Sequence, residues 1–144
     1  MSSFFNEEMY KEIIMDHIKS PRNKDKDHEG YLEYTLKNPS CGDIVTTYIS
    51  LEDETVKDIT YNVEGCSICC SSASMMSEIF KGKTVEETKK IIEEFNKMMI
   101  GEEFNEEILE SAISLKGVYN TPPRIKCATL GYKSYLEAIG ENYE

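Results

Sequence analysis

Three cysteines in this chain stand in segments that suit chemistry better than packing. Cys41 lies in NPSCGD, residues 38–43, where proline, serine and glycine offer little apolar surface. A structural cysteine is usually buried among apolar neighbours, whereas Cys41 is followed two positions later by the carboxylate of Asp43. Cys66 comes directly after a Glu-Gly pair, and Cys127 follows the segment TPPRIK. These four residues are the candidate functional residues of the chain.

Their shared chemistry is the binding of a soft metal. Three thiolates and one carboxylate form a plausible tetrahedral set for zinc, and they also suit an iron–sulfur cluster. Because oxygen binds soft metals less tightly than sulfur, a site containing Asp43 could keep one exchangeable position. The alternatives are three unrelated buried thiols and, for Asp43, a turn carboxylate that accepts a backbone N–H.

The elements that must position these residues follow from hydrophobic periodicity. Strands with short links are predicted over residues 31–37, 44–51 and 56–63, which suits an antiparallel meander. Helices are predicted over residues 4–19, 66–81, 85–100 and 105–115, with a last helix opened by the prolines of the loop 117–123. Cys66 and Cys127 are therefore expected near helix N-termini, where the helix dipole favours the thiolate.

Length and composition predict a single α+β domain spanning residues 1–144, with a net charge of −11. Such an acidic chain is a poor candidate for binding nucleic acid or anionic membrane surfaces. It has neither a long apolar run nor a signal-like N-terminus, so we expect a cytoplasmic protein without membrane association. In a reducing cytosol, its five cysteines are expected to bind metal or do chemistry rather than form disulfides.

Three motifs in this order, NPSCGD, GCSICCSSASMM and PPRIKCATLGY, resemble those of the SufU/IscU-type (NifU N-terminal-like) iron–sulfur cluster assembly proteins. The resemblance covers nearly the whole chain. It implies a SufU/IscU-like sandwich, in which a three-stranded antiparallel sheet packs against several helices and the cysteines gather at one exposed end. The site that it implies consists of Cys41, Asp43, Cys66 and Cys127.

Two features resemble the SufU branch of this family in particular. Lys126 stands where the scaffold branch has a histidine, and the segment between Cys66 and Cys127 is longer than in that branch. The resemblance implies a zinc-dependent sulfurtransferase that accepts persulfide sulfur from a pyridoxal-phosphate (PLP)-dependent cysteine desulfurase of the SufS type. Cys41 would be the acceptor, freed when the partner enzyme supplies a replacement zinc ligand. Downstream iron–sulfur scaffold or acceptor proteins would receive the sulfur.

Cys69 and Cys70 depart from the family pattern, which usually shows no further thiols at this place. On a helix they would share a face with Cys66. Their possible roles are small core residues, alternative metal ligands, or a pair that resolves a persulfide. Arg124 either pairs with a surface acid or steers a persulfide or an acidic partner group near Cys127.

Two other functions compete with sulfur transfer. One is a scaffold that binds iron and on which a [2Fe–2S] or [4Fe–4S] cluster is built and transferred, for which Cys69 and Cys70 leave room. The other is a structural zinc module for protein interaction, but such sites usually have paired CxxC spacings, and here only residues 66–69 fit one. Hydrolytic zinc chemistry ranks below both, because no histidine lies near the motifs and three thiolates would make the metal a poor Lewis acid.

Overall fold

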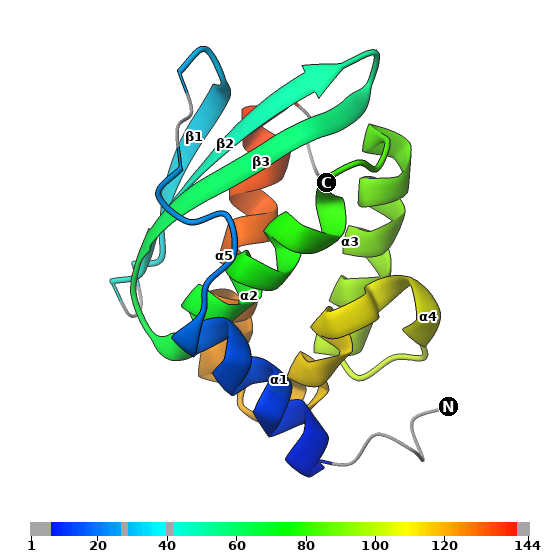
Figure 1. Cartoon of the computed structure of the whole chain (residues 1–144). Helices are drawn as coiled ribbons and strands as arrows, with labels where there is room; N and C mark the ends of the chain where they lie inside the picture. Colours follow the sequence, from blue (N-terminus) through cyan, green and yellow to red (C-terminus); the bar gives the residue numbers. More distant parts are fainter. Residues whose placement is uncertain (1–6, 27–28, 40–41, 141–144) are drawn as a thin grey trace.

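A computed structural model describes residues 7–26, 29–39 and 42–140 (Figure 1). Cys41, the predicted sulfur acceptor, lies outside the described residues, as does its neighbour Ser40. Within the described part of the chain, no helix is both long and apolar enough to cross a membrane.

The predicted antiparallel meander is confirmed. The strands β1 (Leu32–Lys37), β2 (Ile44–Glu52) and β3 (Thr55–Glu64) form one sheet in the order β1-β2-β3. β2 is the central strand, and Val45 pairs with Leu36 on one side and with Val63 on the other. Alternate side chains of β2 are buried, because one face of the sheet is covered by helices and the other is more open.

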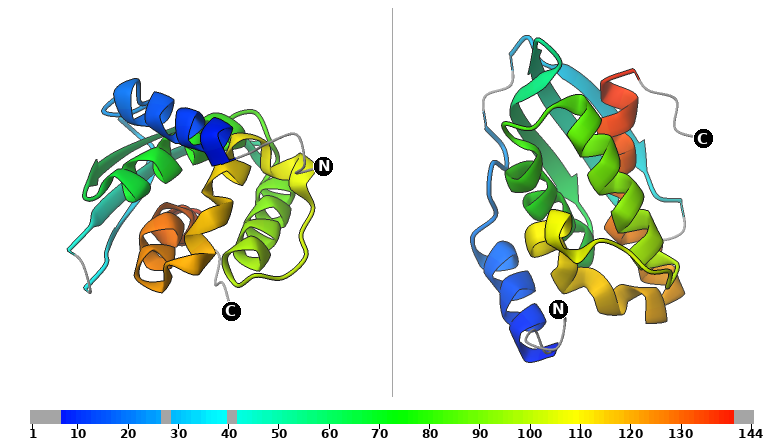
Figure 2. Two further views of the ribbon diagram at one scale, coloured as in Figure 1. Left: turned by 90° about the horizontal axis from the view of Figure 1, so that it is seen from below. Right: turned by 90° about the vertical axis from the view of Figure 1, so that its right-hand side faces the viewer.

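The helices gather on one face of the sheet, which gives the predicted α+β sandwich (Figure 2). They are α1 (Glu7–Lys19), α2 (Ser67–Phe80), α3 (Val85–Met99), α4 (Glu106–Leu109), the 3₁₀ helix η2 (Glu110–Asn120) and α5 (Pro122–Ala138). α2 packs beside α5, and both contact the sheet. α1 and η2 lie against α2, whereas α3 lies on the far side of α5 from β1 (Figure 2).

Two buried clusters hold these layers together. The larger lies between the helices and the sheet, and in it the ring of Tyr132 packs at a tilt against Phe80 and Phe95 with centroid distances of 5.6 and 4.4 Å. The smaller lies between the sheet and the N-terminal halves of α2 and α5, and its buried members are Val45, Tyr61, Val63, Cys69, Ala73, Cys127 and Leu130. Cys66 and Cys70 are partly buried against this smaller cluster. The cysteines of α2 and α5 are therefore tied to the sheet by apolar burial.

α1 is joined to α2 by a buried polar contact. His17 is 3% exposed, and its Nδ1 lies 2.7 Å from the hydroxyl oxygen of Ser74. The same hydroxyl accepts a hydrogen bond from the backbone N–H of Arg22. Burial lowers the pKa of His17, which favours its neutral form. The serines of α2 thus satisfy polar groups that α1 and the following loop bring into the interior.

The region before α5 differs from the prediction. One helix over residues 105–115 and a loop over 117–123 were expected, but α4 ends at Leu109 and the 3₁₀ helix η2 continues to Asn120. Glu110 has a φ of 50°, which interrupts the α-helical hydrogen-bond pattern at that point. α5 then begins at Pro122, because proline is tolerated in the first turn of a helix.

Candidate metal centre

Asp43 directly precedes the central strand β2, and two backbone hydrogen bonds fix the chain around it. The backbone N–H of Asn38 donates to the carbonyl of Asp43 at 2.8 Å, and that of Gly42 donates to the carbonyl of Asn38 at 2.7 Å. Gly42 has a φ of +81°, a conformation that glycine adopts without steric cost. Asp43 itself is only 3% exposed. A buried carboxylate needs hydrogen-bond donors or a cation nearby to compensate its charge.

One carboxylate oxygen of Asp43 is committed to the N-terminus of α2. Its Oδ1 accepts the backbone N–H of Cys66 at 3.1 Å, while Oδ2 lies 3.6 Å from the Cys66 sulfur. Cys66 is the N-cap of α2, and its own side chain makes no capping hydrogen bond. The turn-and-cap role considered for Asp43 is therefore present, but it uses Oδ1 and leaves Oδ2 facing the thiol.

Gly65 makes this approach sterically possible, and the sequence interpretation did not include it. A Cβ placed on Gly65 would lie 2.4 Å from Oδ1 of Asp43, well inside van der Waals contact. Only a residue without a side chain fits between β3 and α2 beside this carboxylate. The sequence does contain a signal for this role, because Gly65 directly precedes the candidate ligand Cys66 at the junction of a strand and a helix.

Three of the four predicted site residues lie together. One ligand atom each of Asp43, Cys66 and Cys127 falls within 4.8 Å of the other two. Two sulfurs and one carboxylate oxygen are ligand types that zinc accepts. The donor set therefore fits zinc with one position left for a further ligand, and metal binding by these residues stays a prediction.

Cys127 joins the group from the second turn of α5. Its helix starts at Pro122, so Cys127 is the sixth residue of α5. The influence of a helix dipole is strongest in the first turn, and the expected thiolate bias at Cys127 stays a prediction. Burial against the sheet positions this residue, which is 1% exposed, and its sulfur lies 3.9 Å from the carbonyl oxygen of Pro123.

A cationic side chain lies beside the two thiols. The charge of a Cys66 thiolate, followed by hydrogen bonds from the guanidinium to Cys127 and Cys66, raises the pKa of Arg124. Of the two roles considered for Arg124, the described contacts therefore correspond to the one near Cys127. Because Arg124 is exposed, solvent weakens this attraction but leaves the guanidinium accessible at the rim of the site.

Arg124→Gln should slow the alkylation of Cys66 in reduced, metal-free protein by about two- to fivefold, because an exposed charge pair stabilises the reactive thiolate only modestly. Peptide mass spectrometry after timed exposure to iodoacetamide at neutral pH measures the rate for this thiol separately. Lys126→Gln removes the same charge from an exposed neighbour and serves as the control. Equal rates in the two variants would mean that Arg124 acts only through the net charge of the protein.

Cys69 and Cys70 differ in their surroundings. Cys69 is 1% exposed, and burial is the main cause that raises the pKa of its thiol, followed by the charges of Asp43 and Cys66. Cys70 is half-buried, and its sulfur lies 3.8 Å from the carbonyl oxygen of Gly65. Burial also raises the pKa of Cys70, against the opposing charge of Lys24. The charges of Asp43 and Cys66 act on both thiols, whereas that of Lys24 acts on Cys70.

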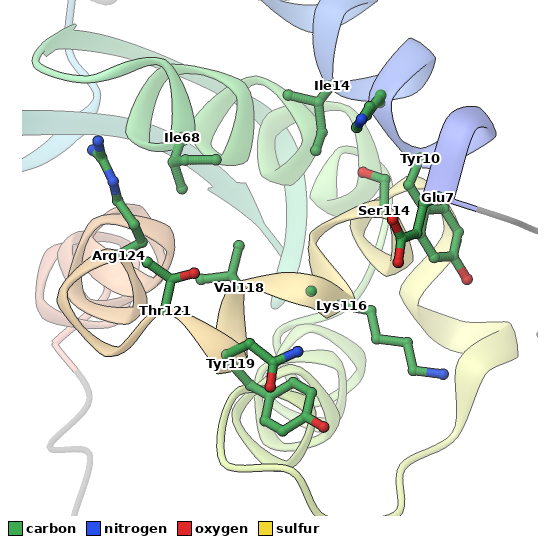
Figure 3. Close-up of a pocket in the computed structure, with 13 residues that line it drawn as sticks. Glu7, Tyr10, Ile14, Ile68, Ser114, Lys116, Val118, Tyr119, Thr121 and Arg124 are labelled. Atoms are coloured by element: carbon green, nitrogen blue, oxygen red, sulfur yellow. The ribbon is translucent and has the colours of Figure 1, made fainter.

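A pocket of about 860 Å³ adjoins the rim of the site on the side away from the sheet (Figure 3). Residues of α1 and η2 form most of its wall, including Tyr10, Ile14 and Val118. Arg124 and Ile68, from the first turns of α5 and α2, close it on the cysteine side. Arg124 therefore borders both the cysteine group and this pocket.

Comparisons with known proteins give a consistent family. The NifU-like N-terminal domain matches residues 9–144. The zinc-dependent sulfurtransferase SufU of Bacillus subtilis (strain 168) is 38% identical over 134 residues, which cover 92% of this chain and 90% of the relative. The iron–sulfur cluster assembly scaffold protein IscU of Thermotoga maritima is 39% identical over 131 residues, which cover 91% of this chain and 92% of the relative.

A solved structure agrees with these sequence relatives. It is described as a scaffold protein of the SUF system from Fervidobacterium islandicum AW-1, and it superposes with a TM-score of 0.74 at 34% identity, covering 85% of this chain and 90% of that one. The match over residues 9–144 and the relatives that align over nine-tenths of their length show that the chain belongs to the NifU-like N-terminal domain family, with relatives of both the SufU and the IscU type.

Proposed function

We propose that this protein is a zinc-dependent sulfur carrier of iron–sulfur cluster assembly, which accepts persulfide sulfur from a cysteine desulfurase. The observation that carries the proposal is the mixed group of Asp43, Cys66 and Cys127, whose ligand atoms lie within 4.8 Å of one another beside the segment that contains Cys41. The name and the full-length similarity of the B. subtilis relative support zinc as the metal. We further propose that residues 1–144 act as one domain in the cytoplasm.

Each residue has a defined part in this proposal. Asp43, Cys66 and Cys127 would hold zinc together with Cys41, and the metal would keep the thiols deprotonated and protected at rest. Cys41 would leave this set and attack the outer sulfur of the donor persulfide. The bond between the two donor sulfurs breaks, the donor departs as a thiolate, and Cys41 becomes the new persulfide.

The second candidate function is an assembly scaffold, favoured by the IscU relative of similar identity. Lys126 argues against it. The side chain is exposed and directly precedes Cys127, and a protonated amine offers no lone pair to a metal. A cluster on this chain would therefore lack the additional ligand that the resemblance places at that position in the scaffold branch.

Metal content and sulfur loading together test the proposal. We expect about one zinc per chain and no visible absorption in untagged protein purified without oxygen. After incubation with a PLP-dependent cysteine desulfurase and cysteine, alkylation and mass spectrometry should find a persulfide on the peptide that contains Cys41. Iron and sulfide in similar amounts, with a brown chromophore, would instead support the scaffold function.

A further inference from the structure

We propose that the outer edge of β1 is a self-association surface, on which a second copy of this chain pairs its own β1 in antiparallel orientation. Among the strands that the structure describes, β1 has β2 as its one neighbour, so its other side is an edge of the sheet (Figure 1). Such an edge presents backbone N–H and C=O groups to any strand of matching pattern. The inference goes beyond the proposed function, because Asp43, Cys66 and Cys127 all lie outside β1.

The register of the sheet decides which residues of β1 point their backbone groups outward. The N–H of Asn38 donates to the carbonyl of Asp43 at 2.8 Å, and residues 38 and 43 continue the pairing of Lys37 with Ile44. Hydrogen-bonded pairs alternate with non-bonded pairs along an antiparallel ladder, so the even-numbered residues of β1 bond to β2. The residues whose N–H and C=O groups point away from β2 are Glu33, Thr35 and Lys37.

The edge strand is exposed and yet held firmly in place. Every residue of β1 except Leu36 is exposed, so the described residues leave most of this strand uncovered. Leu36 packs against the smaller cluster, and because side chains alternate, Leu32 and Tyr34 lie on the same, helix-covered face of the sheet. These two large apolar side chains remain 45% and 40% exposed. The hydroxyl of Ser134 donates to the carbonyl of Tyr34 at 2.7 Å and fixes the strand against α5.

Charge decides the register in which two such edges fit together. A twofold axis through Thr35 places the two copies of Thr35 opposite each other, and Glu33 of each chain opposite the partner subunit's Lys37. Opposite charges directly across a ladder stabilise it, whereas registers centred on Glu33 or Lys37 would place like charges opposite each other. On the helix-covered face, the same register brings Tyr34 beside the partner subunit's Leu36. Backbone groups, charges and apolar side chains are therefore all matched in one register.

A dimer built on this edge is expected to be weak. The pairing joins one strand of six residues from each chain, and interfaces of such small size belong to transient complexes. The net charge of −11 on each chain opposes association, and salt screens that repulsion. We therefore expect a dimer that forms at concentrations of about 0.1 mM and above in about 0.15 M salt.

Exchanging the two charges tests the register. Sedimentation equilibrium of the full chain is measured under a phosphine reductant, so that disulfides cannot join the copies. Glu33→Lys and Lys37→Glu each place like charges opposite one another across the dimer, and each should weaken dimerisation by at least about tenfold. The double variant Glu33→Lys/Lys37→Glu restores the opposite-charge pairs and keeps the wild-type net charge, so it should dimerise within about threefold of the wild type.

A proline tests the backbone pairing separately. Thr35→Pro removes an N–H that points away from β2, so it breaks no bond within the sheet, but it does remove the bonds between the two copies of residue 35. Thr35→Ala is the matched control, because both variants lose the contact of the Thr35 hydroxyl with that of Thr46 at 2.7 Å. We expect the proline variant to be monomeric and the alanine variant to dimerise as the wild type does.

A wild-type chain that stays monomeric at about 1 mM would overturn the inference, as would a dimer that the single charge variants and the proline variant form equally well. Thermal unfolding identifies any variant that has lost its fold, and the charge exchange does not depend on the proline variant. Because self-association is measured without a desulfurase, failure of this inference is distinguishable from failure of the sulfur-carrier proposal.

Discussion

Cys41→Ala should accept no detectable persulfide sulfur from a cysteine desulfurase while still binding about one zinc per chain. Sulfur acceptance needs a nucleophile that can leave the metal, and alanine provides none. We expect zinc to be retained because the substitution leaves Asp43, Cys66 and Cys127 in place, whose ligand atoms lie within 4.8 Å of one another. The expected phenotype is therefore loss of transfer without loss of metal.

Radioactive sulfur supplied as labelled cysteine, with the desulfurase in catalytic amount, measures the transfer, and elemental analysis measures zinc in the same samples. Cys70→Ala is the control, because it removes a half-buried thiol of α2 that lies outside the group of Asp43, Cys66 and Cys127 and whose sulfur is 3.8 Å from the carbonyl oxygen of Gly65. We expect this control to transfer sulfur at the wild-type rate. Wild-type transfer by Cys41→Ala would assign the acceptor role to another thiol.

The placement of the candidate site was largely predictable from sequence because its residues stand at element junctions. The apolar alternation of the strands and the helical periodicity of α2 place Asp43 and Cys66 at neighbouring ends of β2 and β3, and adjacent antiparallel strands bring such ends together. The N-cap position of Cys66 also follows from the local pattern. For Asp43 and Cys66, the local sequence pattern and the sheet topology both predict that the two side chains lie close together.

What could not be predicted depends on contacts between distant segments. The interruption at Glu110 is a backbone conformation with positive φ that no residue preference indicates. The contact of Arg124 with two thiols depends on how α5 lies against α2, and the burial of Cys127 depends on how α5 lies against the sheet. Gly65 was missed for the same reason, because its role is visible only when Asp43 is seen beside it.

Gly65→Ala is expected to weaken zinc binding by about ten- to a hundredfold, the cost typical of losing the support of a ligand. The added methyl would lie 2.4 Å from Oδ1 and 2.6 Å from the carboxyl carbon of Asp43. Gly65 is not among the residues with positive φ, so alanine fits the backbone there. The carboxylate must therefore move, losing its hydrogen bond from the Cys66 N–H and its place in the ligand group.

A double-mutant cycle with Asp43→Ala isolates this mechanism, because removing the carboxylate also removes the two closest atoms from the path of the methyl. Zinc affinity of all variants is measured by competition with a chelator. Gly65→Ala should then cost little in the Asp43→Ala background. Gly117→Ala is the control, since no atom lies within 4 Å of its added methyl. Additive losses in the cycle would show that Gly65 acts through the backbone between β3 and α2, whereas strong non-additivity would identify it as the residue that admits the Asp43 carboxylate to the metal centre.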